Sequence, residues 1–405
     1  MPEPRDPELL YYPKATLIWS AVLIFLLGLR SRRQFRFESG GPWFAANLNR
    51  LAGTAVETAP HDDTIAYYLE RVDPEHLRRW PGRIVRHLIR GKVLDRWRLY
   101  GRFLVAIDGT GPLSFRQRHC EHCLTRQTAG GRALYFHHVR EAKRVTAGGL
   151  AFSLTAEFIE NADPQADRQG CELKAFTRLA QTLQHDWPQL PICLLDGALY
   201  ANAGLLAICR RNRWDYIFTF KPGRLPERFA EFQTIRRLSP HNRAGYRDDG
   251  RRQRFAWVDG LDHQGHRFSA FDCQEQTAGG SGYFAWITSL TVGCRSVITL
   301  ANQGGRLRWK IENEGFNIQK RHGYELEHAY SQHPWAAKNF YFLLQVAHAI
   351  NQLMIRGSLI ADFDQTFGSV RNFLRRLAEA LRNVPIDTRR VGPEADPYQI
   401  RLDSS

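Results

Sequence analysis

The sequence predicts an α/β protein in which a mixed sheet follows a helical N-terminal domain and precedes C-terminal helices. Two unbroken apolar runs, at residues 103–107 and 192–195, are typical of strands buried on both faces, and each leads into Asp-Gly. Helical patterns alternate with strand patterns between residues 171 and 220. Residues 1–100 and the chain from residue 296 onward have the apolar spacing of helices, as expected for helical parts before and after the sheet.

The composition indicates a globular protein with a polyanionic partner. The chain has 405 residues, enough for two or three domains, and 43% of them are hydrophobic. Its net charge of +15 favours a nucleic-acid partner, although a merely basic soluble protein has the same property. Seven cysteines in a chain of this length do not form a secreted disulfide framework, so we expect a reduced, cytoplasmic setting.

Residues 1–100 are expected to form a helical domain. Its first apolar segment, residues 15–29, is shorter than the roughly 20 residues that a membrane span needs. The basic flank follows this segment, whereas a signal peptide carries its charge in front. We therefore expect a buried helix, with a membrane anchor as the alternative. The basic residues between 79 and 92 either contact DNA or form a solvated helix face.

From residue 102 the pattern changes to strands. The first strand is expected to end at Asp108, and the fourth is closed by Asp196. The remaining core elements are strands at 133–139, 150–159 and 215–220 and helices at 171–187 and 203–211. This order of three strands, helix, strand, helix and strand matches the ribonuclease-H-like fold, with residues 101–224 as its first part.

The second half of the chain is expected to add an insertion and more helices. Residues 225–295 are predicted to be a β-rich insertion, with strands at 254–258, 267–273 and 283–290. Residues 296–356 then complete the core with a basic helical segment and a long apolar helix at 335–355. Residues 357–405 are expected to form an amphipathic helix at 366–383 and a flexible tail.

Three stretches together resemble a DDE transposase of a bacterial insertion sequence, in the group with a β-rich insertion before the glutamate. They are Ile107-Asp108-Gly109-Thr110, Leu195-Asp196-Gly197 with Tyr200-Ala201-Asn202, and the segment from Arg308 to Asn317. The resemblance implies that Asp108, Asp196 and Glu312 bind two Mg²⁺ or Mn²⁺ ions. It also implies cleavage and joining of double-stranded DNA at transposon ends and target DNA, by a homodimer associated with the bacterial nucleoid.

The family signature, Tyr-x-x-Arg-x-x-x-Glu-x-x-x-x-x-x-Lys, is matched in part. Arg308 and Glu312 keep their spacing, whereas the Tyr position falls on Gly305 and the Lys position on Gln319, one residue before Lys320. Because Lys320 lies one residue beyond the Lys position of the signature, Glu314 is an alternative to Glu312 as the metal ligand. We prefer Glu312 because it keeps its register with Arg308.

These residues allow an in-line displacement at phosphorus. Two Mg²⁺ ions roughly 4 Å apart can activate the attacking oxygen and stabilise the leaving one. Carboxylates are the hard oxygen ligands that Mg²⁺ prefers. Basic residues near the glutamate and after the last core strand are candidates for phosphate contacts, namely Arg308, Lys310, Lys320, Arg321 and Lys221.

Cys120 and Cys123 have the spacing of metal ligands, and His119 and His122 lie beside them. A second pair of cysteines at matching spacing is absent from the sequence, and Cys171 is a candidate third ligand. Either a structural zinc ion or reduced thiols in a loop would account for this pair.

Two other functions remain compatible with the same residues. A DNA-binding protein without activity could use the same fold, and the departures at the Tyr and Lys positions keep this alternative open. A nuclease that cuts without joining is the other. Metal-dependent cleavage would exclude the first alternative, and a joined product would exclude the second.

Overall fold

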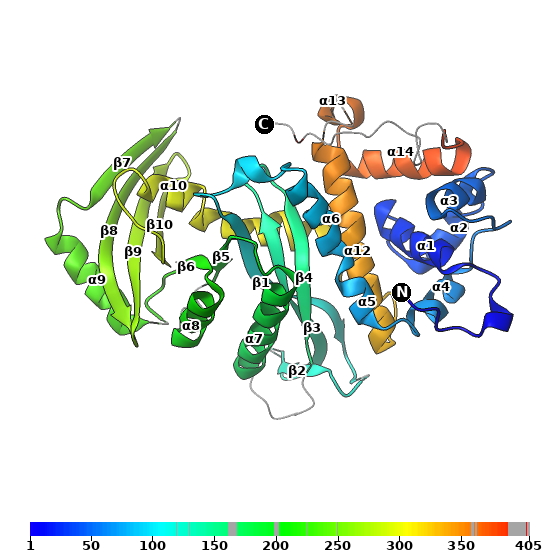
Figure 1. Cartoon of the computed structure of the whole chain (residues 1–405), viewed down its shortest axis with the longest axis horizontal. Helices are drawn as coiled ribbons and strands as arrows, with labels where there is room; N and C mark the ends of the chain where they lie inside the picture. Colours follow the sequence, from blue (N-terminus) through cyan, green and yellow to red (C-terminus); the bar gives the residue numbers. More distant parts are fainter. Residues whose placement is uncertain are drawn as a thin grey trace.

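The computed structural model describes residues 1–118, 120–128, 130–160, 168–197, 202–223, 225–248, 250–357, 360, 363–387 and 402. The predicted α/β class is confirmed, because the chain forms a ten-stranded mixed sheet, and its helical N-terminal and C-terminal parts lie together on one side of that sheet (Figure 1). Residues Tyr200 and Ala201 of the second family stretch, His119 and most of the C-terminal tail lie outside the described residues.

The sheet has the strand order β2-β3-β1-β5-β6-β10-β9-β8-β7, and β4 pairs with β3. Its strands are β1 (Phe103–Phe115), β2 (Leu124–Gln127), β3 (Ala133–Val145), β4 (Ala151–Ile159), β5 (Ile192–Asp196), β6 (Asp215–Thr219), β7 (Arg243–Asp248), β8 (Arg251–His263), β9 (His266–Thr277) and β10 (Gly280–Thr288). The pairs β1–β5 and β5–β6 are parallel, and the other pairs are antiparallel.

The prediction that the first strand ends at Asp108 is wrong. Its parallel pairing with β5 stops at Ala106, but its antiparallel pairing with β3 runs on, with Asp108 opposite Glu141 and Phe115 opposite Tyr135. The strand therefore changes partners at the aspartate instead of ending there. A register shift between Thr110 and Leu113 bends this extension.

Strand β3 is also longer than predicted, because its charged residues are buried and paired. Glu141 and Lys143 are both fully buried, with Nζ and Oε1 3.0 Å apart. The Tyr341 hydroxyl donates to Glu141 at 2.6 Å, and Lys143 Nζ donates to Gln345 at 2.7 Å. Both partners lie on α12 (Pro334–Arg356), which therefore covers this face of the sheet.

The insertion extends the same sheet rather than forming a separate one. Strand β10 pairs with β6 and with β9, so β7 to β10 continue from the last core strand. Two of its elements were not predicted, β7 and α9 (Pro226–Leu238), and Phe232 of α9 is fully buried.

The N-terminal helices pack around α12 and α14 (Figure 1). Their bounds are η1 (Pro7–Leu9), α1 (Lys14–Leu26), α2 (Arg32–Glu38), α3 (Phe44–Ala52), α4 (Asp62–Leu69), α5 (Pro74–Arg78), α6 (Trp80–Arg90) and η2 (Asp95–Trp97). As predicted, α1 is buried, and it contacts α12. Among the described residues, no helix combines the length and apolarity needed to cross a membrane.

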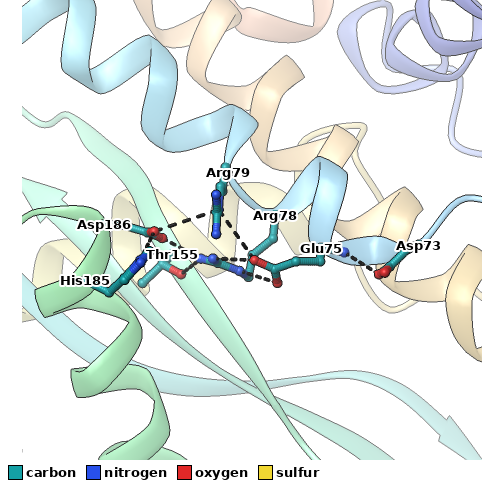
Figure 2. Close-up of polar contacts among 7 residues, drawn as sticks. All are labelled: Asp73, Glu75, Arg78, Arg79, Thr155, His185 and Asp186. Carbon is teal, nitrogen blue, oxygen red and sulfur yellow. Dashed lines mark hydrogen bonds and ion pairs between the residues drawn. The ribbon is translucent and has the colours of Figure 1, made fainter. Parts of the chain in front are cut away.

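Ion pairs hold α5 and α6 against α7 (Arg168–Asp186) in the core (Figure 2). Arg78 lies between Glu75 at 2.6 Å and Asp186 at 2.7 Å, and Arg79 lies 3.8 Å from Asp186. Arg86 donates to the backbone carbonyl of Asp186 at 2.6 Å. Arg79 and Arg86 of the basic segment, together with Arg78 just before it, therefore join the N-terminal helices to the core.

The remaining helices are α8 (Ala203–Asn212), α10 (Val297–Asn302), the 3₁₀ turn η4 (Gly305–Arg308), the π-helical turn η5 (Ile311–Asn317), α11 (Ile318–Arg321), α13 (Phe363–Phe367) and α14 (Val370–Asn383). The C-terminal helix α14 packs on α3 of the same chain. Asn47 joins the two by donating to the carbonyls of Leu381 and Val384 at 2.8 and 2.7 Å.

Candidate active site

Asp108 and Asp196 lie on neighbouring parallel strands. The register pairs Ala106 with Leu195, so Asp196 ends β5 one residue short of the position of Asp108. Side chains alternate along a strand, so Asp108 follows the face of Ala106 while Asp196 follows the face of Leu194. Regular alternation would direct the two carboxylates to opposite faces, but both residues lie close to the point where β1 and β5 separate, and their charges interact.

Asp196 is the more buried of the two, with 2% of its side chain exposed against 33% for Asp108. The pKa of Asp196 is raised to about 7, chiefly by burial and to a smaller extent by the negative charge of Asp108. Arg140, the amide of Gly197 and Arg308 act in the opposite direction. Asp108 and Arg308 thus lie within electrostatic range of Asp196.

Arginines accompany both aspartates. Arg308 Nη1 donates to Asp108 Oδ2 at 3.0 Å, and Arg140 Nη2 lies 3.6 Å from Asp196 Oδ2. This Asp196 oxygen is buried and accepts no hydrogen bond from the described residues. The site is therefore nearly neutral in charge as it stands, and one buried oxygen keeps an unused acceptor position.

The third predicted acid lies on the π-helical turn η5, which contacts β1 and β4. Glu314 is paired with Lys310, with Nζ and Oε1 3.0 Å apart. In the part of the chain that is described, the half-buried Glu312 carboxylate has neither a hydrogen bond nor an ion pair. Extra residues in a helix turn are frequent at functional sites, because they re-aim the side chains around them.

A close approach at Gly315 sets the position of this turn. A Cβ atom there would lie 3.1 Å from Cδ and Cε of Lys143, so η5 rests directly on the buried lysine of β3. Gly315 itself is buried. The turn that carries both glutamates is therefore packed on the face of the sheet from which Asp108 projects.

The structure explains the two departures from the family signature. At Gly305 a Cβ atom would lie 2.4 Å from Nε1 of Trp286, which leaves no space for a tyrosine. Gln319 is fully buried and donates to Gln345 at 2.7 Å. A DNA-contacting lysine could not occupy such an internal position.

The remaining predicted DNA contacts are spread over the surface. Lys320 is paired with Glu327 at 2.8 Å, whereas Arg321 is exposed and lines a groove between α1, α2 and α14. Lys221 is exposed beyond the end of β6. Trp309 is 50% exposed, and the Arg308 guanidinium lies 4.4 Å from its ring centre.

The donor set at this site suits Mg²⁺ or Mn²⁺. Carboxylate oxygens are the ligands that these ions prefer, and the unused oxygen of Asp196 is an available ligand atom. The oxygens of Asp108, Asp196 and Glu312 do not all lie within 4.8 Å of one another, as a preformed metal group of described residues would require. Metal binding would therefore need side-chain rotation and the release of Asp108 from Arg308.

A second group of candidate ligands lies at the turn after β1. Cys120, Cys123 and His137 bring two Sγ atoms and an imidazole nitrogen within 4.8 Å of one another. The sequence indicated the two cysteines but not His137, because strand pairing alone places this histidine beside them. His119 and the side chain of Cys171, the other ligands considered, lie outside the described part.

Comparison with known proteins found no matching family model and no curated protein with significant sequence similarity. The functional assignment below therefore depends on the residues and their geometry.

Proposed function

We propose that this protein is a DDE transposase that cleaves and joins DNA strands in a metal-dependent reaction. The observation that carries the proposal is the placement of Asp108 and Asp196 on adjacent parallel strands, with their charges coupled and the turn of Glu312 packed on β1. Open α/β sheets bind their ligands at the carboxyl ends of such strands.

The sheet topology supports a ribonuclease-H-like core. The strands β4, β3, β1, β5 and β6 are neighbours in this order, with β3 antiparallel to β1 and with β5 and β6 parallel to it. The resemblance requires the two aspartate strands to be adjacent, as β1 and β5 are. The strands of the insertion lie between β6 and the turn that carries Glu312, where the resemblance expects them.

In this proposal, Asp108, Asp196 and Glu312 hold the metal ions. When bound, these ions activate the attacking oxygen and stabilise the leaving one at the phosphorus. Arg308 neutralises Asp108 in the absence of metal. Once Asp108 binds a cation, this guanidinium becomes available for a phosphate oxygen, a partner that its planar fork matches well.

A basic groove supports the binding of DNA. It has a volume of about 850 Å³ and is lined by five arginines, namely Arg30, Arg321, Arg371, Arg375 and Arg382. Glu38 pairs with Arg382 and Glu325 with Arg30. Ion pairs of Arg321, Arg371 or Arg375 are not found within the described ranges, so these three suit contacts with a DNA backbone.

The test is cleavage of DNA that carries the ends of the encoding element, with Mg²⁺ or Mn²⁺. We expect Asp108→Asn and Asp196→Asn to lose cleavage by at least about a thousandfold while DNA binding persists, because each change removes a metal-ligand charge. Asp259→Asn, an exposed aspartate of β8, is the matched control. A joined product from the wild type separates a transposase from a simple nuclease.

A DNA-binding protein without catalysis is the second candidate. It is favoured by the Arg308–Asp108 ion pair and by the absence of a compact oxygen group formed by the three acids. A wild-type protein that binds end DNA but never cuts it with either metal would establish this alternative.

A further inference from the structure

The turn between β1 and β2 is held by few apolar contacts. Among the described residues from 113 to 127, Cys123 is the only one that is buried, and most of the others are exposed. This segment nevertheless has a defined fold, in which β2 pairs with the first residues of β3. A stretch with so little buried apolar surface needs another source of stability.

Three side chains converge inside this turn. Cys120 and Cys123 lie in the loop, where the amide of Cys123 donates to the carbonyl of Cys120 at 3.4 Å. His137 comes from β3, opposite Leu113 of β1. The loop and the strand thus supply ligand atoms from separate elements, as metal sites that hold small folds together do.

The distances between these atoms match the edges of a tetrahedron around a zinc ion. The two Sγ atoms are 3.6 Å apart, and Nε2 of His137 is 3.4 Å from Cys120 Sγ and 3.7 Å from Cys123 Sγ. Zn–S bonds of about 2.3 Å and a Zn–N bond of about 2.05 Å at tetrahedral angles give edges of about 3.8 and 3.6 Å. All three measured separations lie close to these values.

Other uses of the cysteines fit less well. A disulfide requires its sulfur atoms about 2.05 Å apart, far closer than these two. Thiolate and imidazole are ligands for zinc rather than for the magnesium ions of the proposed catalytic site. We propose that Cys120, Cys123 and His137 bind a structural zinc ion that fixes the extension of β1 and β3 beyond Asp108.

This site goes beyond the proposed function and is separate from the carboxylates. It also borders a small cavity of about 50 Å³ against α12 and the loop before it, which Cys120, His122 and His137 line together with Tyr330 and Lys338. Zinc at this position would therefore tie the tip of the hairpin to the side of the sheet that α12 covers.

The test is the zinc content of the purified full-length protein, measured by elemental analysis after incubation with zinc and gel filtration. We expect one zinc ion per chain in the wild type, and at least about a tenfold lower content in Cys120→Ser, Cys123→Ser and His137→Ala. Cys294→Ser removes an exposed cysteine elsewhere and is expected to retain the ion.

Cobalt substitution keeps the test independent of whether each variant folds. Wild-type protein loaded with Co²⁺ should show the visible absorption of tetrahedral cobalt bound by thiolate, and added Zn²⁺ should abolish it. A wild type without stoichiometric zinc and without this absorption would overturn the proposal. Asp196→Asn should keep its zinc, so failure of the catalytic proposal and failure of this one are distinguishable.

Discussion

At the scale of single residues, the three candidate acids differ in their surroundings: Arg308 pairs with Asp108, Asp196 is buried, and Glu312 lies on the π-helical turn. The resemblance selected Asp108, Asp196 and Glu312 by spacing, and two of these lie where adjacent strands separate. Spacing could not predict the Arg308–Asp108 ion pair or the contribution of His137 to the cysteine turn, because both depend on tertiary packing. The Lys position of the signature falls on Gln319, whose side chain is internal.

Burial of Asp196 should lower the stability of the metal-free protein. Its folded pKa of about 7 lies above the value of about 3.9 in an unfolded chain, so ionisation costs folding free energy as the pH rises between these values. We therefore expect Asp196→Asn to raise the free energy of unfolding by about 2–4 kcal/mol at pH 8. Urea denaturation with a chelator measures this, and a less stable variant would contradict it.

The space at Gly305 gives a second prediction at this scale. Gly305→Ala should lower the free energy of unfolding by about 1–3 kcal/mol, because its Cβ would meet the Trp286 indole. Gly293→Ala is the matched control, since a Cβ there meets nothing within 4 Å. Thermal denaturation of both variants checks the difference, and equal melting temperatures would show that the Trp286 contact does not restrict this position.

At the scale of elements, apolar patterns predicted the buried strands and helices correctly. Charged residues hid one buried strand segment from this kind of prediction. The strand β5 ends at Asp196 as predicted, and the apolar helix at 335–355 matches α12. The charged second half of β3 has no apolar pattern, and only its partners on α12 show why it is buried. The sequence likewise does not indicate that η5 is π-helical or that Gly315 packs against Lys143.

The contact between α5 and α7 should depend on pH. Burial raises the pKa of Asp186, but hydrogen bonds from Arg78 and His185 lower it more, so the net shift is downward. Its stabilisation is therefore complete above the unfolded value of about 3.9 and is lost as the pH falls through the folded pKa. We expect Asp186→Asn to cost about 2 kcal/mol at pH 7, with the cost decreasing below pH 4.

Urea denaturation of the wild type and Asp186→Asn between pH 7 and pH 3 measures this difference. Glu227→Gln is the control, because its pair with Arg228 is exposed and weak, and it should change little at any pH. A difference between wild type and Asp186→Asn that stays constant over the whole range would contradict the assignment.

At the scale of the whole molecule, the sheet extends from the insertion to the helices that surround α12 (Figure 1). The basic groove is lined by residues of α2 and α14 and by the segments that follow α1 and α11. The sequence predicted the α/β class and the order of the core elements. It did not predict that the insertion would continue the core sheet, because strand patterns do not specify which edges pair. It also gave no sign that α14 would pack on α3.

The groove predicts a difference between two neighbouring arginines of α14. Both Arg375 and Arg376 are exposed, but only Arg375 lines the groove. Arg375→Glu should weaken DNA binding about five- to tenfold and reduce its salt dependence by about one phosphate contact. Arg376→Glu should have a smaller effect, and fluorescence anisotropy over a range of salt concentrations measures both. Equal effects of the two substitutions on DNA binding would show that the groove does not contact DNA.

The central claim is that Glu312 completes a metal site with the two aspartates, and the two glutamates of one turn test it most directly. The measurement is single-turnover cleavage of end-bearing DNA with Mg²⁺ by Glu312→Gln and Glu314→Gln. We predict that Glu312→Gln loses cleavage by at least about a thousandfold and still binds DNA, because a metal-ligand charge is gone. Glu314→Gln loses only its ion pair with Lys310 and should stay within about tenfold of the wild type. An active Glu312→Gln would contradict the account.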